Sequence, residues 1–166
     1  MNWIGYCDYI PFWKRNDPLI QDDDNGFTYA MHWIINVSKD VPEYIRHNPI
    51  IKETYGNTCA MLWIEHIKTD IPEYLRHNPL LQNNYGYSCA MLWIELVKTD
   101  VPEYLRYDPS TQNHHGDTCA MVWIQDIGTD VPLYLRHDPN IKNRNGTTCA
   151  MLWIEYVETD VPHYLK

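Results

Sequence analysis

Histidine, cysteine and carboxylate side chains are the residues of this sequence that could perform chemistry, as metal ligands, nucleophiles or acid–base groups. The chain has 8 histidines and 22 acidic residues among 166 positions. His114 and His115 are adjacent, which supplies two ligands for a metal ion but no third. No motif for a nucleophile, a phosphate-binding loop or a zinc hydrolase accompanies them. We therefore expect a protein that is not an enzyme and that holds no cofactor or metal.

Four of the five cysteines recur at one position of an internal repeat, where the first full copy has Tyr29 instead: Cys59, Cys89, Cys119 and Cys149. Equivalent positions in stacked helical layers lie about 8–10 Å apart, beyond the Cα separation that a disulfide tolerates. Each copy supplies a single thiol, and no C-x-x-C is present, so a zinc site is not expected. We interpret these cysteines as buried, reduced thiols.

The charge of the chain argues against several classes of partner. A formal net charge of −9 disfavours binding to a phosphate backbone or to an anionic membrane surface. No apolar run approaches the roughly 18–20 residues of a membrane span, and the N-terminus lacks the features of a signal peptide. We expect an intracellular, cytoplasmic protein whose partner is another protein, with neither nucleic acid nor membrane as a ligand.

The elements that would position these residues are copies of one 30-residue unit. Gly56, Met61, Trp63 and Pro72 of one copy recur at the same offsets in the others. A fixed period in this range is typical of repeat arrays, in which each unit buries its apolar face on its neighbours. We predict a single domain, 1–166, with a degenerate N-terminal cap, four full repeats and a partial C-terminal repeat: 1–25, 26–55, 56–85, 86–115, 116–145 and 146–166.

Within one copy the residue pattern predicts two helices and a polar turn. The apolar side chains of the first helix have helical spacing: Ala60, Trp63, Ile64 and Ile67. Thr58 is placed to cap this helix. Asp70 and Glu73 form a capping-box pattern around Pro72 for a shorter second helix. The polar loop that follows, residues 79–87 and their equivalents in the other copies, is called the finger below.

Two further series recur at fixed positions and are interpreted as scaffold. The arginine series is expected to pair with acidic groups of adjacent layers: Arg46, Arg76, Arg106 and Arg136. The histidine series, which Tyr107 interrupts, is expected beside the C-terminal end of a helix dipole: His47, His77 and His137.

With these residues identified, the unit resembles an ankyrin repeat. The run from Asp138 to Leu152 is similar to the β-turn finger and first helix of that family, and the resemblance covers 26–166 and, weakly, 3–25. The period is shorter than the family's, which is about 33. The family's Thr-Pro-Leu-His is replaced, for example at 118–121, so the histidine that braces the cap in typical members is absent. Tryptophan replaces a small alanine, and we hypothesise that it fills the volume left by a shortened second helix.

The resemblance implies an all-α repeat solenoid of stacked helix-turn-helix units. It also implies a non-catalytic scaffold that binds a partner protein through the fingers and the first-helix face. Residues that vary between copies at those places form the predicted site: Phe27, Tyr55, His66, Tyr85, Tyr87, Leu96, His114, His115, Asp117, Asp126, Arg144 and Tyr156. Exposed tyrosines are typical of interface hot spots.

Two alternatives remain open at this level. The varied positions could reflect drift of polar loops without functional consequence. The chain could also be a self-associating structural array, because its first residues are unusually rich in apolar side chains: Trp3, Tyr6, Tyr9, Ile10, Phe12 and Trp13. We expect a monomer or weak self-association.

Overall fold

The structure of the protein is a computed structural model, and it describes residues 17–166. Most of the predicted N-terminal cap, including its aromatic cluster and Cys7, lies outside the described residues. The described part is all-helical and has no strand, as predicted. The chain divides into two compact units, of which the first ends at Asn78 and the second begins at Pro79.

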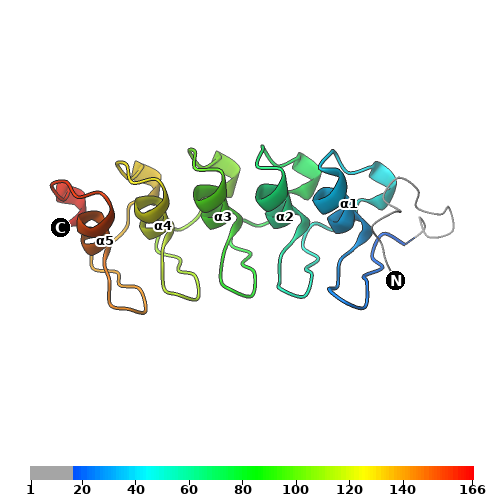
Figure 1. Ribbon diagram of the computed structural model, residues 1–166, viewed down its shortest axis with the longest axis horizontal. Coiled ribbons are helices and arrows are strands. Elements are labelled where there is room, and N and C mark those ends of the chain that lie inside the picture. Colours follow the sequence, from blue (N-terminus) through cyan, green and yellow to red (C-terminus); the bar gives the residue numbers. More distant parts are fainter. Residues whose placement is uncertain (1–16) are drawn as a thin grey trace. The chain divides into compact units, whose positions relative to one another are not determined.

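The described residues form five α-helices (Figure 1). The first unit contains α1 (Tyr29–Val37) and α2 (Cys59–His66), and the second contains α3 (Cys89–Leu96), α4 (Cys119–Asp126) and α5 (Cys149–Tyr156). Helix α1 packs on α2, α3 on α4, and α4 on α5. Adjacent helices within each unit are therefore packed in a repeat-like arrangement.

The α-helices begin where the sequence predicted. The Thr58 hydroxyl accepts a hydrogen bond from the Met61 N–H at 3.4 Å, and an equivalent cap opens each of the other helices, with Ser88 in place of threonine at α3. Helix α2 ends because Lys68 adopts the left-handed conformation (φ 59°). The equivalent residue after α4 is Gly128 (φ 67°), and glycine adopts this conformation more readily than lysine does. Local sequence therefore determines both ends of these helices.

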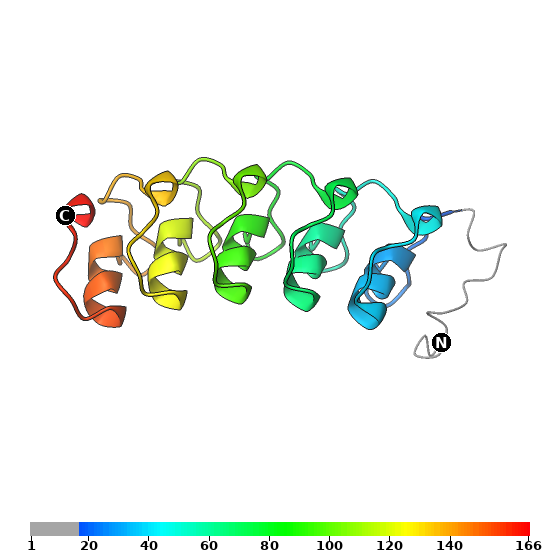
Figure 2. The same ribbon diagram turned by 90° about the horizontal axis from the view of Figure 1, so that it is seen from above.

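The predicted second helix is wrong in its extent, because it is only a single 3₁₀ turn in each copy: Glu43–Ile45, Glu73–Leu75, Glu103–Leu105, Leu133–Leu135 and His163–Leu165. The capping box is also absent. Pro72 is extended (ψ 140°) and the turn has no side-chain cap, while the Asp70 carboxylate accepts from Arg76 instead, at 3.2 Å. Within each unit these turns lie beside the α-helices (Figure 2).

The core of each unit consists of the packed helix faces together with the recurring tryptophans. Ile94 is fully buried, and Trp93 is only 6% exposed. The Trp93 indole N–H donates to the Thr99 hydroxyl and to the Asp100 carbonyl, both at 3.1 Å. Tryptophan therefore joins its helix to the loop that leads to the 3₁₀ turn, which agrees with a side chain that occupies space beside a short second element.

Candidate protein-binding surface

Each finger is held in shape by one side chain that bridges its backbone. Asn83 Oδ1 accepts from the N–H groups of Tyr85 and Tyr87, both at 3.0 Å. Asn113 and Asn143 brace their own fingers in the same way, and Glu53 does so with one carboxylate oxygen for each N–H. A single acceptor that serves two N–H groups fixes the loop without a strand.

Neighbouring fingers in a unit are joined through their backbones. In the second unit, the His114 N–H donates to the Tyr85 carbonyl at 3.0 Å, and the Arg144 N–H donates to the His115 carbonyl at 2.9 Å. The turn at Gly86 has φ +80°, and a Cβ there would lie 2.9 Å from the Asn113 carbonyl carbon. Glycine is therefore required for its conformation and also for the close approach of the next finger.

The fingertips of the second unit bring together four of the predicted site residues. Tyr85, His114, His115 and Arg144 are exposed at adjacent fingertips, and Tyr85 has an exposed fraction of 51%. Because their backbones are tied to one another, these side chains are presented from an ordered edge. The arrangement can contact a protein through aromatic, imidazole and guanidinium groups.

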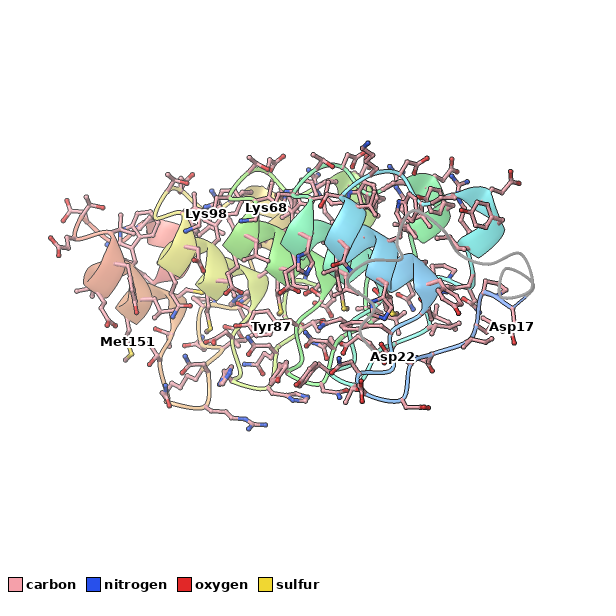
Figure 3. The ribbon with its side chains drawn as sticks, turned by 45° about the vertical axis from the view of Figure 1, so that its right-hand side comes forward. Asp17, Asp22, Lys68, Tyr87, Lys98 and Met151 are labelled. Atoms are coloured by element: carbon pink, nitrogen blue, oxygen red, sulfur yellow. The ribbon has the colours of Figure 1, made fainter. Side chains whose placement is uncertain are left out.

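A second group of predicted residues surrounds Tyr87, between the fingers and the helices of this unit (Figure 3). Burial raises the pKa of Tyr87, and the carboxylates of Glu95, Asp117 and Asp126 raise it further. The pKa of Glu95 is also raised, first by burial and then by Asp126. Lys98 balances part of this charge through an ion pair of 3.5 Å with Asp126. Tyr87, Asp117 and Asp126 were among the predicted site residues, and the structure brings them together; Glu95 and Lys98 were not predicted.

The remaining predicted residues do not join these two groups. Phe27 is half-buried, and its ring packs edge-on against His32 with centroids 5.3 Å apart. Tyr55 and His66 are exposed in the first unit. Leu96 is half-buried at the end of α3, and Tyr156 is 50% exposed at the end of α5.

Each histidine of the series follows the C-terminal end of a 3₁₀ turn, but its side chain contacts the cap of an α-helix and not the end of that turn. His77 Nδ1 faces the Asn78 carbonyl at 2.9 Å, so this nitrogen carries the hydrogen, and Nε2 accepts from the Thr58 hydroxyl at 2.8 Å. His47 and His137 bind Thr28 and Thr118 in the same way. A histidine 19 residues after the capping threonine therefore holds the threonine hydroxyl in place. This contact replaces the one made by the histidine of the ankyrin Thr-Pro-Leu-His motif, which this chain lacks.

The third full repeat uses a different pair of residues for the same contact. Ser88 replaces the threonine and Tyr107 replaces the histidine, and their hydroxyl oxygens lie 2.7 Å apart. The longer tyrosine compensates for the shorter serine. This paired replacement supports a packing role for the series.

The pairing predicted for the arginine series also needs correction, because each arginine pairs within its own repeat. Arg106 Nη2 lies 3.3 Å from Asp100 Oδ2, and its guanidinium stacks on the Tyr134 ring of the next repeat at 3.8 Å. The Tyr134 hydroxyl donates to Asp100 and accepts from the Val101 N–H at 3.0 Å. We call this set of four residues the clasp. Asp40, Val41, Arg46 and Tyr74 form it in the first unit.

The cysteines of the described residues are free and buried, as predicted. Burial raises the pKa of Cys59 and of Cys89 to about 12, so these thiols are not activated nucleophiles. Between residues 17 and 166, no three His, Cys, Asp or Glu side chains are grouped as a metal site would require. His114 and His115 therefore find no third ligand there.

One histidine–carboxylate pair lies apart from the repeat pattern, in the first unit. His32 stands where Leu62 stands in the next copy, and its Nε2 lies 2.8 Å from Asp22 Oδ2. Burial alone would raise the pKa of Asp22, but hydrogen bonds from Asn25, His32 and Phe27 lower it overall. The adjoining cavity of about 30 Å³ has room for a water molecule but not for a substrate.

No helix between residues 17 and 166 is both long and apolar enough to cross a membrane. No protein-family model and no curated protein matches the sequence. Among solved structures, 147 chains match, and a fold shared so widely does not by itself select a function.

One matching chain comes from a structure of a predatory endopeptidase from Bdellovibrio bacteriovorus in complex with an immunity protein. The TM-score is 0.65 at 17% identity, over 90% of this chain and 84% of that chain. At this identity the likeness is one of fold.

This neighbour corrects the function expected from the sequence. We predicted a scaffold of the ankyrin class that binds through its fingers and first-helix face, with a self-associating array as the alternative. The matching structure is instead a complex between an endopeptidase and an immunity protein. The expectation of a protein partner is supported, whereas the scaffold assignment is wrong.

Proposed function

We propose that this protein is an immunity-type inhibitor, which binds an endopeptidase and holds it inactive. The observation that carries the proposal is the fold shared with a chain of the endopeptidase–immunity protein structure over 90% of this sequence. Two features of the chain agree with an inhibitory role. The thiols of its described residues are buried and not activated, and the fingers within each unit are braced by side chains and joined by backbone hydrogen bonds. A surface ordered before binding loses less entropy when a complex forms.

An inhibition assay tests this proposal. The purified chain is titrated into the Bdellovibrio endopeptidase, and into a panel of purified endopeptidases from the organism that makes this protein, with casein as substrate. We expect saturable inhibition of one enzyme at equimolar ratio and a 1:1 complex on size-exclusion chromatography. Absence of inhibition across the panel would contradict the proposal.

The matched control is the same chain after heat unfolding. An unfolded chain competes only as another substrate and is cleaved, whereas an inhibitor must act as the folded protein and stay intact. Inhibition that is equal for the folded and unfolded chains, with degradation of both, would argue against an inhibitory role.

We also propose that the copies stack as one continuous ankyrin-like solenoid. The support is the register of the repeat, together with the recurrence of the same finger and clasp contacts in each unit. Small-angle X-ray scattering should give a radius of gyration clearly above the roughly 15 Å expected for a compact domain of this length. A value near 15 Å would contradict a continuous array.

A further inference from the structure

The outer face of α5 exposes apolar side chains that are buried in other copies. Met151 is 53% exposed and Ile154 is 61% exposed (Figure 3 labels Met151). The equivalent side chains of α1, α3 and α4 are fully buried, in helices that each pack against the next one in their unit: Met31, Ile34, Met91, Ile94, Met121 and Ile124. The structure therefore shows what covers this kind of face, namely an α-helix. We call Met151, Ile154 and Glu158 the α5 face.

The backbone beside the α5 face repeats the groups that bind a following copy elsewhere. Tyr85 and His115 offer their carbonyls to the next finger, whereas no donor among the described residues reaches the equivalent carbonyl of Asn145. A Cβ at Gly86 would collide with the next finger, but one at Gly146 would meet nothing within 4 Å. The α5 face thus adjoins a finger edge that is shaped to receive another finger.

The charge at the edge of the α5 face is reversed relative to α3. Lys98 has the left-handed conformation (φ 58°) just after the end of α3. Its ammonium group pairs with Asp126 at the end of α4. Glu158 occupies the same place after α5, with φ 57°. A helix packed on α5 in the same register would place a side chain opposite Glu158 where α4 has Asp126, and a Lys or Arg there would form an ion pair of reversed polarity.

We propose that the α5 face is a docking site for an amphipathic α-helix of the partner protein, with apolar side chains against Met151 and Ile154 and a Lys or Arg against Glu158. The existence of a protein partner rests on the proposed function. A second copy of this chain fits less well than such a helix. Its α1 has the His32–Asp22 ion pair where the other copies have Leu or Val, and each chain has a net charge of −9.

A surrogate helix in the register of the repeat tests the proposal. A copy of residues 137–166 is appended after Lys166 of the full chain, with Tyr156 of the appended copy changed to Lys in one version and to Asp in another. The readout is the rate at which hydrogen peroxide oxidises Met151, because oxidation of methionine follows its exposure. We expect the Lys version to slow this oxidation about tenfold relative to the unextended chain, and the Asp version to slow it less.

Two variants of the first 166 residues serve as matched controls. Glu158→Lys should reverse the ranking of the two extensions, because it exchanges the sign of the charge at the contact. Ile154→Lys should abolish the protection of Met151 while the circular dichroism spectrum of the chain is retained. The Lys-bearing segment, supplied as a separate peptide, should protect Met151 in trans at higher concentration.

Three results would overturn the inference. Met151 could oxidise at the same rate with and without the extensions, or the two extensions could protect equally in both the native and the Glu158→Lys background. Sedimentation equilibrium could instead reveal a dimer of the unextended chain that Ile154→Lys dissociates, which would make a second copy the occupant. No peptidase enters this experiment, so its failure is separable from failure of the inhibition assay.

Discussion

At the scale of single residues, the fingers depend on glycine for two separate reasons. Gly86 and Gly146 have nearly the same positive φ, +80° and +79°. A Cβ at Gly86 would lie 2.8 Å from His114 Cδ2, whereas one at Gly146 has open space. The two positions therefore separate conformational strain from steric exclusion within one protein.

Gly146→Ala should lower the free energy of unfolding by about 1 kcal/mol, which is the cost of the left-handed conformation alone. Gly86→Ala should lose a further 1–3 kcal/mol or so, because the next finger must move. Urea unfolding with a comparison of m-values measures both. Equal losses would show that close approach of the fingers is unimportant.

A second residue-scale property is the neutral charge of the cap-bracing histidine. Burial lowers the pKa of His77 below the ordinary value of 6.5, the Asn78 carbonyl opposes this, and Lys52 adds to it. The unfolded chain then binds a proton at a higher pH than the folded chain does. Stability from this group is present above pH 6.5 and is lost as the pH falls below it.

Replacing the Thr58–His77 pair by the Ser–Tyr pair of the next copy tests this sign. The Thr58→Ser/His77→Tyr variant should lose less stability than the natural chain between pH 7 and pH 5, by urea unfolding at each pH. His66→Tyr alters an exposed histidine and is the control. A steeper loss in the double variant than in the natural chain would contradict the neutral assignment.

At the scale of elements, the clasp joins neighbouring 3₁₀ turns within each unit. Tyr134 binds the fully buried Val101 through the backbone N–H and binds the Asp100 carboxylate with the same hydroxyl. Burial raises the pKa of Tyr134 to about 12, and the hydrogen bond to Asp100 adds to this rise, so the hydroxyl remains a donor at neutral pH.

Tyr134→Phe should cost about 1–3 kcal/mol, because it leaves the Val101 N–H buried without an acceptor. Tyr156→Phe removes an equally large phenol from an exposed site and should change stability by less than about 0.5 kcal/mol. Thermal and urea unfolding compare the two variants. A loss at Tyr134 no larger than at Tyr156 would mean that the clasp contributes only packing.

Trp93 connects α3 to the loop that follows it, and Trp93→Ala should cost about 3–5 kcal/mol for the loss of a large buried side chain. Trp93→Phe should cost less than Trp93→Ala, because phenylalanine keeps part of the buried volume. Both substitutions remove the hydrogen bonds to Thr99 and Asp100. Chemical denaturation gives both values. If Trp93→Ala lowers the free energy of unfolding by less than about 1 kcal/mol, the hypothesis that tryptophan fills the volume beside the short second element is wrong.

At the scale of the whole molecule, a repeat chain is stabilised by contacts between neighbouring copies, so a local defect should have local effects. Tyr164 belongs to the last clasp, where its hydroxyl binds the Val131 N–H at 3.0 Å. Tyr164→Phe should therefore speed amide hydrogen exchange in α4 and α5 and leave α1 unchanged. Faster exchange along the whole chain, measured by mass spectrometry, would indicate a single cooperative unit.

Much of the local structure could be predicted from sequence because it depends on residues close together in the chain. The capping threonine lies three residues before the N–H that donates to its hydroxyl. The helical spacing of the apolar residues is visible within one copy. The length of the second helix was overestimated. The residues of a capping box were present, but the extended conformation of Pro72 delays the turn to Glu73.

The contacts that hold neighbouring copies together were decided only by the tertiary structure. The histidine meets the cap 19 residues away, and the clasp joins residues 34 apart. Recurrence marked all of these residues as scaffold, but it could not say which series contacts which, because every series has the same period. Exposure of Met151 likewise depends on whether another helix lies against α5. Local spacing therefore determined the repeat and its helix starts, while packing between copies determined the partners of each side chain, since those contacts form only when the copies are stacked.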